Sequence, residues 1–215
     1  MKLSENTNYR RYMEYCSTEQ YDGAITALQA CIDDAMLSRD QGHLAYLLQL
    51  MGDVQFKVGR TTDAMDYYRL AEEQSEGSMA ALYKNAVFLA ETLNDRQGSI
   101  EKCDQLIKAS ETLLAKDASD KDGGYFLVSG IALKGHCLAL QSDVTGAGEC
   151  LKSLLAADES IAGHAVKLCE ELMSRGYWID DAKRYLRRIA QKLGREPRYW
   201  PLLAQIEEIL RIQQA

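Results

Sequence analysis

The chain has 215 residues, of which 47% are hydrophobic and 27% are charged, and this balance excludes an intrinsically disordered protein. Its formal net charge of −7 disfavours nucleic acid and anionic membranes as partners, because like charges repel. The only prolines are Pro197 and Pro201, and stretches of alternating polar and β-branched residues are scarce. The sequence therefore predicts an all-α fold.

The N-terminal segment and the cysteines indicate a cytoplasmic protein. Residues 1–11 are polar and lack the apolar segment of a signal peptide. No stretch approaches the roughly 18 apolar residues of a membrane span. The six cysteines form no C-x-x-C pair, and a chain of this size does not need disulfides to fold. We therefore expect reduced thiols and no membrane segment.

The first predicted helix pair covers residues 5–35. Large apolar residues at helical spacing precede a polar turn. Ser17 and Gln20 have the spacing of a capping box, which predicts that the second helix of the pair begins there.

The clearest pattern lies in residues 44–74. A large apolar residue and a glycine precede an aromatic residue and a turn, and small, aromatic and small residues follow at helical spacing. Glycine inside a helix costs about 1 kcal/mol relative to alanine, so Gly52 indicates close packing of two helices. Thr61 or Thr62 is expected to cap the second helix. The residues of the pattern are Leu48, Met51, Gly52, Phe56, Gly59, Ala64, Tyr68 and Ala71.

This segment resembles a tetratricopeptide repeat, a helix pair with a leucine–glycine pair, an aromatic residue and then a spaced alanine and aromatic residue. Leu48 replaces the tryptophan of the family, Phe56 arrives one position late, and the proline that ends each repeat is missing. The resemblance implies a right-handed α-solenoid of antiparallel helix pairs. It also implies a protein-binding adaptor or scaffold without enzymatic activity.

The small, large, apolar triad of the second helix recurs along the chain. Successive triads begin 40, 35, 48 and 35 residues apart, and two of these intervals match the family repeat of about 34 residues. The longer intervals predict extended helices or inserted loops. Further repeats are expected at 79–109, 125–155 and 163–190. The triads are Ala24, Leu28, Cys31; Ala64, Tyr68, Ala71; Ser99, Cys103, Leu106; Ala147, Leu151, Leu154; and Ala182, Leu186, Ile189.

Two segments lie outside these helix pairs. Residues 116–124 are rich in Asp, Lys and Gly, which predicts a loop and a possible hinge within a single domain that spans residues 1–215. Trp200 to Ile212 reads as a final helix that covers the open end of the stack, as terminal repeats require.

In the family, the first helix of each pair lines a concave groove that binds proteins. In the first three repeats the corresponding positions are mostly aromatic or apolar, which suits a bound peptide or helix, and in the fifth they are charged. For Phe56 and Phe88, burial in the core remains an alternative. The predicted protein-binding residues are Tyr9, Met13, Tyr46, Gln49, Asp53, Phe56, Lys84, Phe88, His136, His164, Lys167 and Glu171.

No pattern in the sequence indicates catalysis, a metal or a cofactor. His136 and Cys137 are adjacent, so on a helix they point about 100° apart and cannot easily share a metal ion. No H-E-x-x-H motif, phosphate-binding loop or nucleophile elbow is present. We therefore expect a protein that is not an enzyme.

The strongest charge feature is the 183–198 segment, where seven basic residues and one acidic residue give a local charge of +6. This segment reads either as a solvated outer face or as a patch for an acidic partner or nucleic acid. Three alternatives to the adaptor hypothesis therefore stay open. They are a regulator linked to nucleic acid through residues 183–198, a chaperone for secreted or assembly subunits, and self-association.

Overall fold

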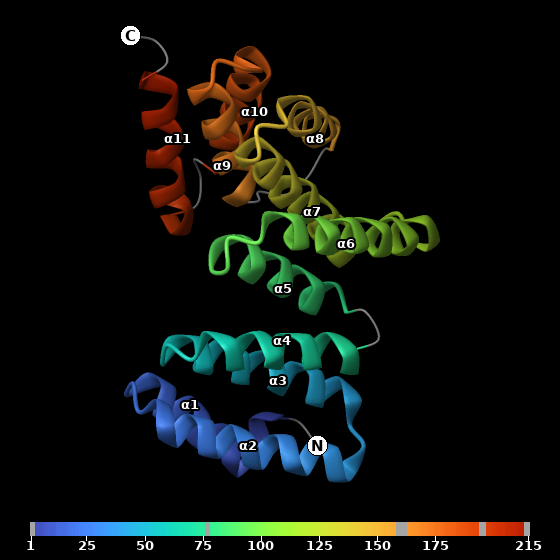
Figure 1. Cartoon of the computed structure of the whole chain (residues 1–215), viewed down its shortest axis with the longest axis vertical. Helices are drawn as coiled ribbons and strands as arrows, with labels where there is room; N and C mark the ends of the chain where they lie inside the picture. The colour runs from blue at the N-terminus through green and yellow to red at the C-terminus, as the bar shows by residue number, and fades with distance from the viewer. Residues whose placement is uncertain (1–2, 76–77, 158–162, 194–196, 213–215) are drawn as a thin grey trace. The chain divides into compact units, whose positions relative to one another are not determined.

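The computed structural model describes residues 3–75, 78–157, 163–193 and 197–212, and every regular element in these ranges is helical (Figure 1). The predicted all-α fold is confirmed. The chain forms two compact units, Met1–Asn85 and Ala86–Ala215, and the division falls inside helix α5. The units are described separately below.

The first unit is built from consecutive antiparallel helices. Helix α1 packs on α2, α2 on α3, and α3 on α4. The core lies between α2 and α3, where Leu28, Leu47 and Met51 are fully buried. The helices are α1 (Thr7–Ser17), α2 (Tyr21–Ser38), α3 (Gln41–Lys57), α4 (Thr61–Gln74) and the start of α5 (Met79–Glu91), after a short 3-10 turn at Leu3–Glu5.

The second unit continues the same construction around α7. Helix α7 packs against α6, α8 and α9, and α10 packs against α8 and α9. Helix α11 lies on α9 and α10 and buries Ile206 and Ile209, so the predicted final helix is present with the expected bounds. The helices are α6 (Arg96–Lys116), α7 (Lys121–Leu140), α8 (Val144–Ala156), α9 (Gly163–Ser174), α10 (Ile179–Leu193) and α11 (Trp200–Ile212), with a 3-10 turn at Pro197–Tyr199.

The triads predicted from sequence form the inner face of the second helices. All fifteen residues are buried, and none is more than 6% exposed. Gly52 shows why small residues are needed opposite them: a Cβ at this position would lie 2.7 Å from Cε1 of Tyr68. The two helices of the clearest repeat therefore touch where the sequence predicts.

A residue in the left-handed conformation marks the turn inside each helix pair. Left-handed backbone ends a helix and reverses the chain within a few residues. The residue is a glycine at two of the five turns, where a side chain would be strained. The five positions are Glu19, Gly59, Asn94, Ser142 and Gly176.

The predicted helix caps are wrong in two places. The hydroxyl of Ser17 donates to the Glu14 carbonyl inside α1, and Gln20 caps α2 without a side-chain bond. Thr61 already lies within α4, which Arg60 begins without a side-chain cap. The chain caps other helices with aspartates, each of which accepts from the backbone N–H three residues later. These aspartates are Asp40, Asp95, Asp120 and Asp143.

The predicted loop at 116–124 is shorter than expected. Asp120 caps α7, so Lys121 to Gly124 are helical and only residues 117–120 connect α6 to α7. The loop was predicted too long because glycine weakens a helix. In the structure, the backbone N–H of Gly123 donates to Asp120, and this cap lets α7 begin before the two glycines. The hinge at this segment stays a prediction.

Helix α7 has the length and composition to cross a membrane, which the sequence reading did not anticipate. Half of its most apolar window is buried inside the unit, where Leu133 and Cys137 face neighbouring helices. Because α7 packs against α6, α8 and α9, its apolar character is that of a core helix.

Helix length explains the uneven repeat intervals. Helices α4 and α5 have 14 and 13 residues. Helices α2 and α3 have 18 and 17, and α6 and α7 have 21 and 20. The intervals of 40 and 48 residues therefore come from extended helices rather than inserted loops.

Candidate protein-binding faces

In the first unit, large side chains from α1 and α3 lie exposed on the first-helix positions predicted to bind a partner. Met13 is 53% exposed, and Tyr46 and Phe56 are each 43% exposed. The hydroxyls of Tyr9 and Tyr46 lie 3.4 Å apart, so the two rings approach each other from different helices. We call Tyr9, Met13, Tyr46 and Phe56 the aromatic face.

A hollow of about 360 Å³ lies beside Tyr46. The side chain of Gln49 also borders it, although Gln49 is largely buried. The surrounding residues are small or uncharged, so the hollow offers space next to an aromatic ring. Its lining is Gln41, Gly42, Ala45, Tyr46, Gln49, Gln74, Ser75, Ser78 and Ala80.

Asp53 sits between the aromatic residues and is fully engaged. Its carboxylate accepts from the Tyr68 hydroxyl at 2.7 Å and from Lys84 Nζ at 2.6 Å. Burial and the bond to Asp53 raise the pKa of Tyr68, so the phenol stays protonated and keeps donating. Asp53 and Lys84 therefore neutralise each other and link α3, α4 and α5.

In the second unit, the corresponding positions carry a cluster of charged groups. Glu91 at the end of α5 accepts from Lys167 Nζ at 2.5 Å and lies 3.1 Å from His164 Nε2, and both partners are on α9. The rings of His136 and His164 are 6.5 Å apart. Glu171 in the last turn of α9 pairs with Arg175, which directly follows the helix. We call Glu91, His164 and Lys167 the Glu91 clamp.

The protonation states in the clamp follow from burial and bonding. Burial lowers the pKa of His164, although its bond to Glu91 opposes the shift. Burial opposes ionisation of Glu91, but the hydrogen bonds from Lys167 and His164 outweigh it and lower the Glu91 pKa. Burial and the neighbouring His164 lower the pKa of His136 to about 4. At neutral pH, Glu91 is therefore ionised and both histidines are neutral.

The structure divides the predicted site residues into two groups. Phe88 is 5% exposed and Gln49 and His164 are also buried, so these three present little surface to a partner. For Phe88, the core alternative raised at the sequence level fits the structure. Phe56 is the opposite case, because it is exposed. Glu91 was missed, since only the folding of α9 against the end of α5, more than 70 residues apart in sequence, reveals its role.

The basic segment at 183–198 is partly occupied within its own unit. Arg188 donates to the carbonyl oxygens of Leu154 and Leu155, both at 2.7 Å, and so satisfies the C-terminal end of α8. Arg184 pairs with Asp181. Arg195 lies outside the described residues. The segment is therefore in part a structural contact rather than a free cationic patch.

Two observations on the described residues bear on chemistry, the protonation of the buried thiols of Cys31 and Cys169 and the absence of a metal site. Burial raises the pKa of Cys31 to about 11 and that of Cys169 to about 12, which keeps both thiols protonated and poorly nucleophilic. Across the described ranges, no three His, Cys, Asp or Glu side chains are arranged to hold a metal ion.

Known structures share this fold at low sequence identity. No protein-family model matches the chain, and no curated protein matches it in sequence. PilW, a widely conserved type IV pilus biogenesis factor, superposes with a TM-score of 0.61 and 20% identity over 98% of this chain and 87% of its own. A tetratricopeptide repeat protein from Parabacteroides merdae superposes with a TM-score of 0.58 and 13% identity, over 94% and 72%. The chain therefore has a tetratricopeptide-repeat fold.

Proposed function

We propose that this tetratricopeptide-repeat chain is a non-enzymatic adaptor that binds a peptide or helix of another protein on the aromatic face of its first unit. The observation that carries the proposal is the exposure of Met13, Tyr46 and Phe56 on adjacent first helices. Tyrosine and other aromatic residues supply large contact area at small entropic cost, and they dominate binding energy in protein interfaces.

The details of the face favour an apolar ligand with few charges. Asp53 and Lys84 are already paired with each other, so neither offers an uncompensated charge to a partner. The hollow beside Tyr46 can take one apolar side chain of the ligand, and the Tyr9 and Tyr46 hydroxyls can bond to its backbone. An amphipathic helix or an extended segment meets these requirements.

The experiment is a capture assay in lysate of the source organism. The three baits are wild type, Tyr46→Ala/Phe56→Ala, and Met36→Ala/Leu37→Ala. The last pair removes two exposed apolar side chains from α2, outside the aromatic face, and is the matched control. We expect one protein to be caught by wild type and by the control but not by the Tyr46/Phe56 variant. Circular dichroism should show equal helicity in all three.

Capture by all three baits would contradict the assignment of the aromatic face.

Once a partner is identified, its purified binding segment can be titrated against each variant by fluorescence anisotropy. We expect Tyr46→Ala/Phe56→Ala to weaken binding at least tenfold, since two aromatic anchors typically contribute more than 1.4 kcal/mol together.

A second candidate function is assembly of secreted or filament subunits, and the likeness to PilW over most of both chains favours it. A protein of this kind would hold apolar segments of one client until assembly. Its signature is co-purification with a single aggregation-prone subunit, and loss of filaments on deletion of the gene. A cytoplasmic location and self-association remain proposals that fractionation and sedimentation would test.

A role in nucleic-acid binding has less support, because Arg188 is bonded to α8 and the whole chain is acidic. Filter binding to single-stranded RNA and duplex DNA at low salt would decide it. Binding that weakens steeply with added salt would establish the alternative, and no retention would remove it.

A further inference from the structure

One ion pair, Asp53–Lys84, lies within the aromatic face and can be reached from solvent. Asp53 follows Tyr46 by seven residues and precedes Phe56 by three, so these three residues share one side of α3. The side chains of Asp53 and Lys84 are 38% and 37% exposed. A segment bound on the aromatic face would therefore meet both charges.

The packing of the helix pair fixes the position of the Asp53 carboxylate. Gly52 allows the buried Tyr68 ring to cross α3 closely, since a Cβ at Gly52 would lie 2.7 Å from that ring. The crossing brings the Tyr68 hydroxyl within 2.7 Å of one oxygen of Asp53, and Lys84 Nζ donates to the other oxygen at 2.6 Å. Each oxygen of the carboxylate therefore has its own donor.

The next charged residue along α3 is directed elsewhere. Lys57 follows Phe56, and its Nζ lies 5.9 Å from the centroid of the Tyr21 ring at the start of α2, which is a cation–π distance. The charge presented between Tyr46 and Phe56 therefore depends on the Asp53–Lys84 pair, whose sum is zero.

A charged group of a ligand would lose hydration at this pair without meeting a net opposite charge. A carboxylate could pair with Lys84 only by displacing Asp53, and an ammonium could pair with Asp53 only by displacing Lys84. Either exchange leaves one charge of the protein unpaired, which is unfavourable in an interface. An uncharged group of the ligand avoids this cost.

We infer that the Asp53–Lys84 pair determines the charge specificity of the aromatic face, and the inference rests on the binding of a partner segment there as proposed above. The pair selects a segment that is uncharged where it crosses the pair and apolar where it contacts Tyr46 and Phe56. Acidic and basic segments are both disfavoured, although the net charge of −7 would by itself attract basic ones.

The test begins with a phage-displayed library of random 12-residue peptides, selected on the full chain. One enriched uncharged peptide is then synthesised with Gln, Glu or Lys at each position in turn, and fluorescence anisotropy gives the dissociation constants. For wild type, we expect the Glu and Lys versions at the positions that cross the pair to bind about two- to fivefold more weakly than the Gln version.

Two single variants should admit opposite charges. Asp53→Asn keeps an acceptor for Tyr68 but leaves Lys84 without its carboxylate, so the Glu version should bind about two- to fivefold more tightly than the Gln version. Lys84→Gln should favour the Lys version by a similar factor. Asp53→Asn/Lys84→Gln removes both charges and should again bind the Gln version best. A merely structural role of the pair would instead weaken all three versions alike.

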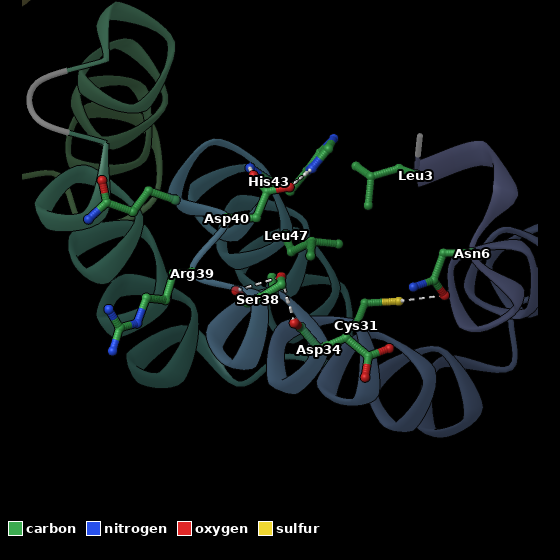
Figure 2. Close-up of a pocket in the computed structure, with 11 residues that line it drawn as sticks. Leu3, Asn6, Cys31, Asp34, Ser38, Arg39, Asp40, His43 and Leu47 are labelled. Carbon is green, nitrogen blue, oxygen red and sulfur yellow. Dashed lines mark hydrogen bonds and ion pairs between the residues drawn. The ribbon is translucent and has the colours of Figure 1, made fainter. Parts of the chain in front are cut away.

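Asp40→Asn is the matched control, because Asp40 is a carboxylate that is paired outside the aromatic face. Figure 2 shows it beside His43 at a hollow formed by the start of α1, the end of α2 and the start of α3. Its Oδ2 lies 2.5 Å from His43 Nδ1, and the described residues that line this hollow include none of the aromatic face. Asparagine caps a helix as well as aspartate does, so α3 should stay intact. The variant changes the net charge by the same one unit as Asp53→Asn, and it should keep the wild-type preference.

The inference is overturned if Asp53→Asn and Lys84→Gln keep the wild-type preference, or if Asp40→Asn changes it as Asp53→Asn does. A wild-type preference for the Lys version would also overturn it, because net charge would then decide. Failure of the proposed function looks different. In that case no peptide is enriched, or the enriched peptides bind Tyr46→Ala/Phe56→Ala as tightly as wild type, and the aromatic face falls together with the inference.

Discussion

The first-helix faces of the two units share one construction but present different surfaces. In the first unit, Met13, Tyr46 and Phe56 are exposed, and the central charge of Asp53 is cancelled by Lys84. In the second unit, the same kind of position is filled by the Glu91 clamp, in which α5 and α9 bind each other. The first face presents exposed apolar area to a partner, whereas the polar groups of the second face are already hydrogen-bonded to one another.

This difference shows which positions of the fold are constrained. The second helices of both units bury the same small, large, apolar triads, because these residues hold each pair together. The exposed residues of the first helices do not hold a helix pair together, so their residue types can vary between neighbouring repeats. Packing alone therefore predicts the stack, and the surface of the first helices has to be examined residue by residue.

The two phenylalanines give the largest expected contrast. Phe88→Ala should lower the free energy of unfolding by about 3–5 kcal/mol, because it removes a buried ring and leaves a cavity. Phe56→Ala should cost less than about 1 kcal/mol, since Phe56 is exposed. Urea denaturation followed by circular dichroism measures both. Equal small losses would return Phe88 to the binding surface.

Gly148 tests how tightly the second unit is packed. A Cβ at this position would overlap the indole of Trp178, whose Nε1 donates to the Val144 carbonyl at 3.0 Å. We expect Gly148→Ala to cost about 1–3 kcal/mol, because the ring has to move. The matched control is Gly124→Ala, at a helical glycine with open space around it, which should be neutral or stabilising by up to about 1 kcal/mol.

The caps of two second helices, α4 in the first unit and α8 in the second, differ at the level of about 1 kcal/mol. Asp143 caps α8 in the second unit, and Asp143→Ala should cost about that amount. Arg60 begins α4 in the first unit without a side-chain cap, so Arg60→Asp should stabilise the protein by up to about 1 kcal/mol. Thermal melts of the two variants should shift in opposite directions. A shift in the same direction would show that these turns are held by other contacts.

The smallest effect concerns pH and belongs to the second unit. The pKa of His136 is about 4 in the folded chain, against 6.5 ordinarily, so the unfolded chain binds more protons between these values. The contribution of His136 to the free energy of unfolding is therefore fully present above pH 6.5 and is lost as the pH drops toward 4. The slope from His136 is less than about 1 kcal/mol per pH unit, since the ring is only partly buried.

His136→Gln should flatten this slope, which urea midpoints at pH 7, 6 and 5 would measure. Glu91→Gln should cost less than about 1 kcal/mol at neutral pH, because the clamp is partly exposed. An unchanged slope in His136→Gln would show that the ring does not titrate in this range.

Much of the fold was predictable because it depends on local spacing. The triads, the final helix at 200–212 and Gly52 against Tyr68 all follow from which residues lie on one side of a helix. The caps were harder, since Ser, Thr and Asp compete for the same role near each turn. Among the helices whose N-cap the structure describes, Asn6 caps α1 and aspartate takes the role in every other helix that has a side-chain cap.

The site was predicted less completely. Sequence spacing places both Phe56 and Phe88 on first helices, but only the packed neighbours decide which ring is buried. Glu91 acquires its role from His164 and Lys167, which lie more than 70 residues away in the sequence. Tertiary contacts of this kind need coordinates.

The unequal lengths of the helices follow a rule of whole turns. Relative to α4 and α5, with 14 and 13 residues, α2 and α3 are each four residues longer, and α6 and α7 are each seven residues longer. At 3.6 residues per turn, these additions are about one and two turns. Growth by whole turns, shared equally by two antiparallel partners, returns each helix to the stack with the same side inward. We therefore expect this fold to tolerate insertions in whole turns. An insertion of two residues into a single helix should destabilise the protein far more than an insertion of seven residues into each of two partner helices.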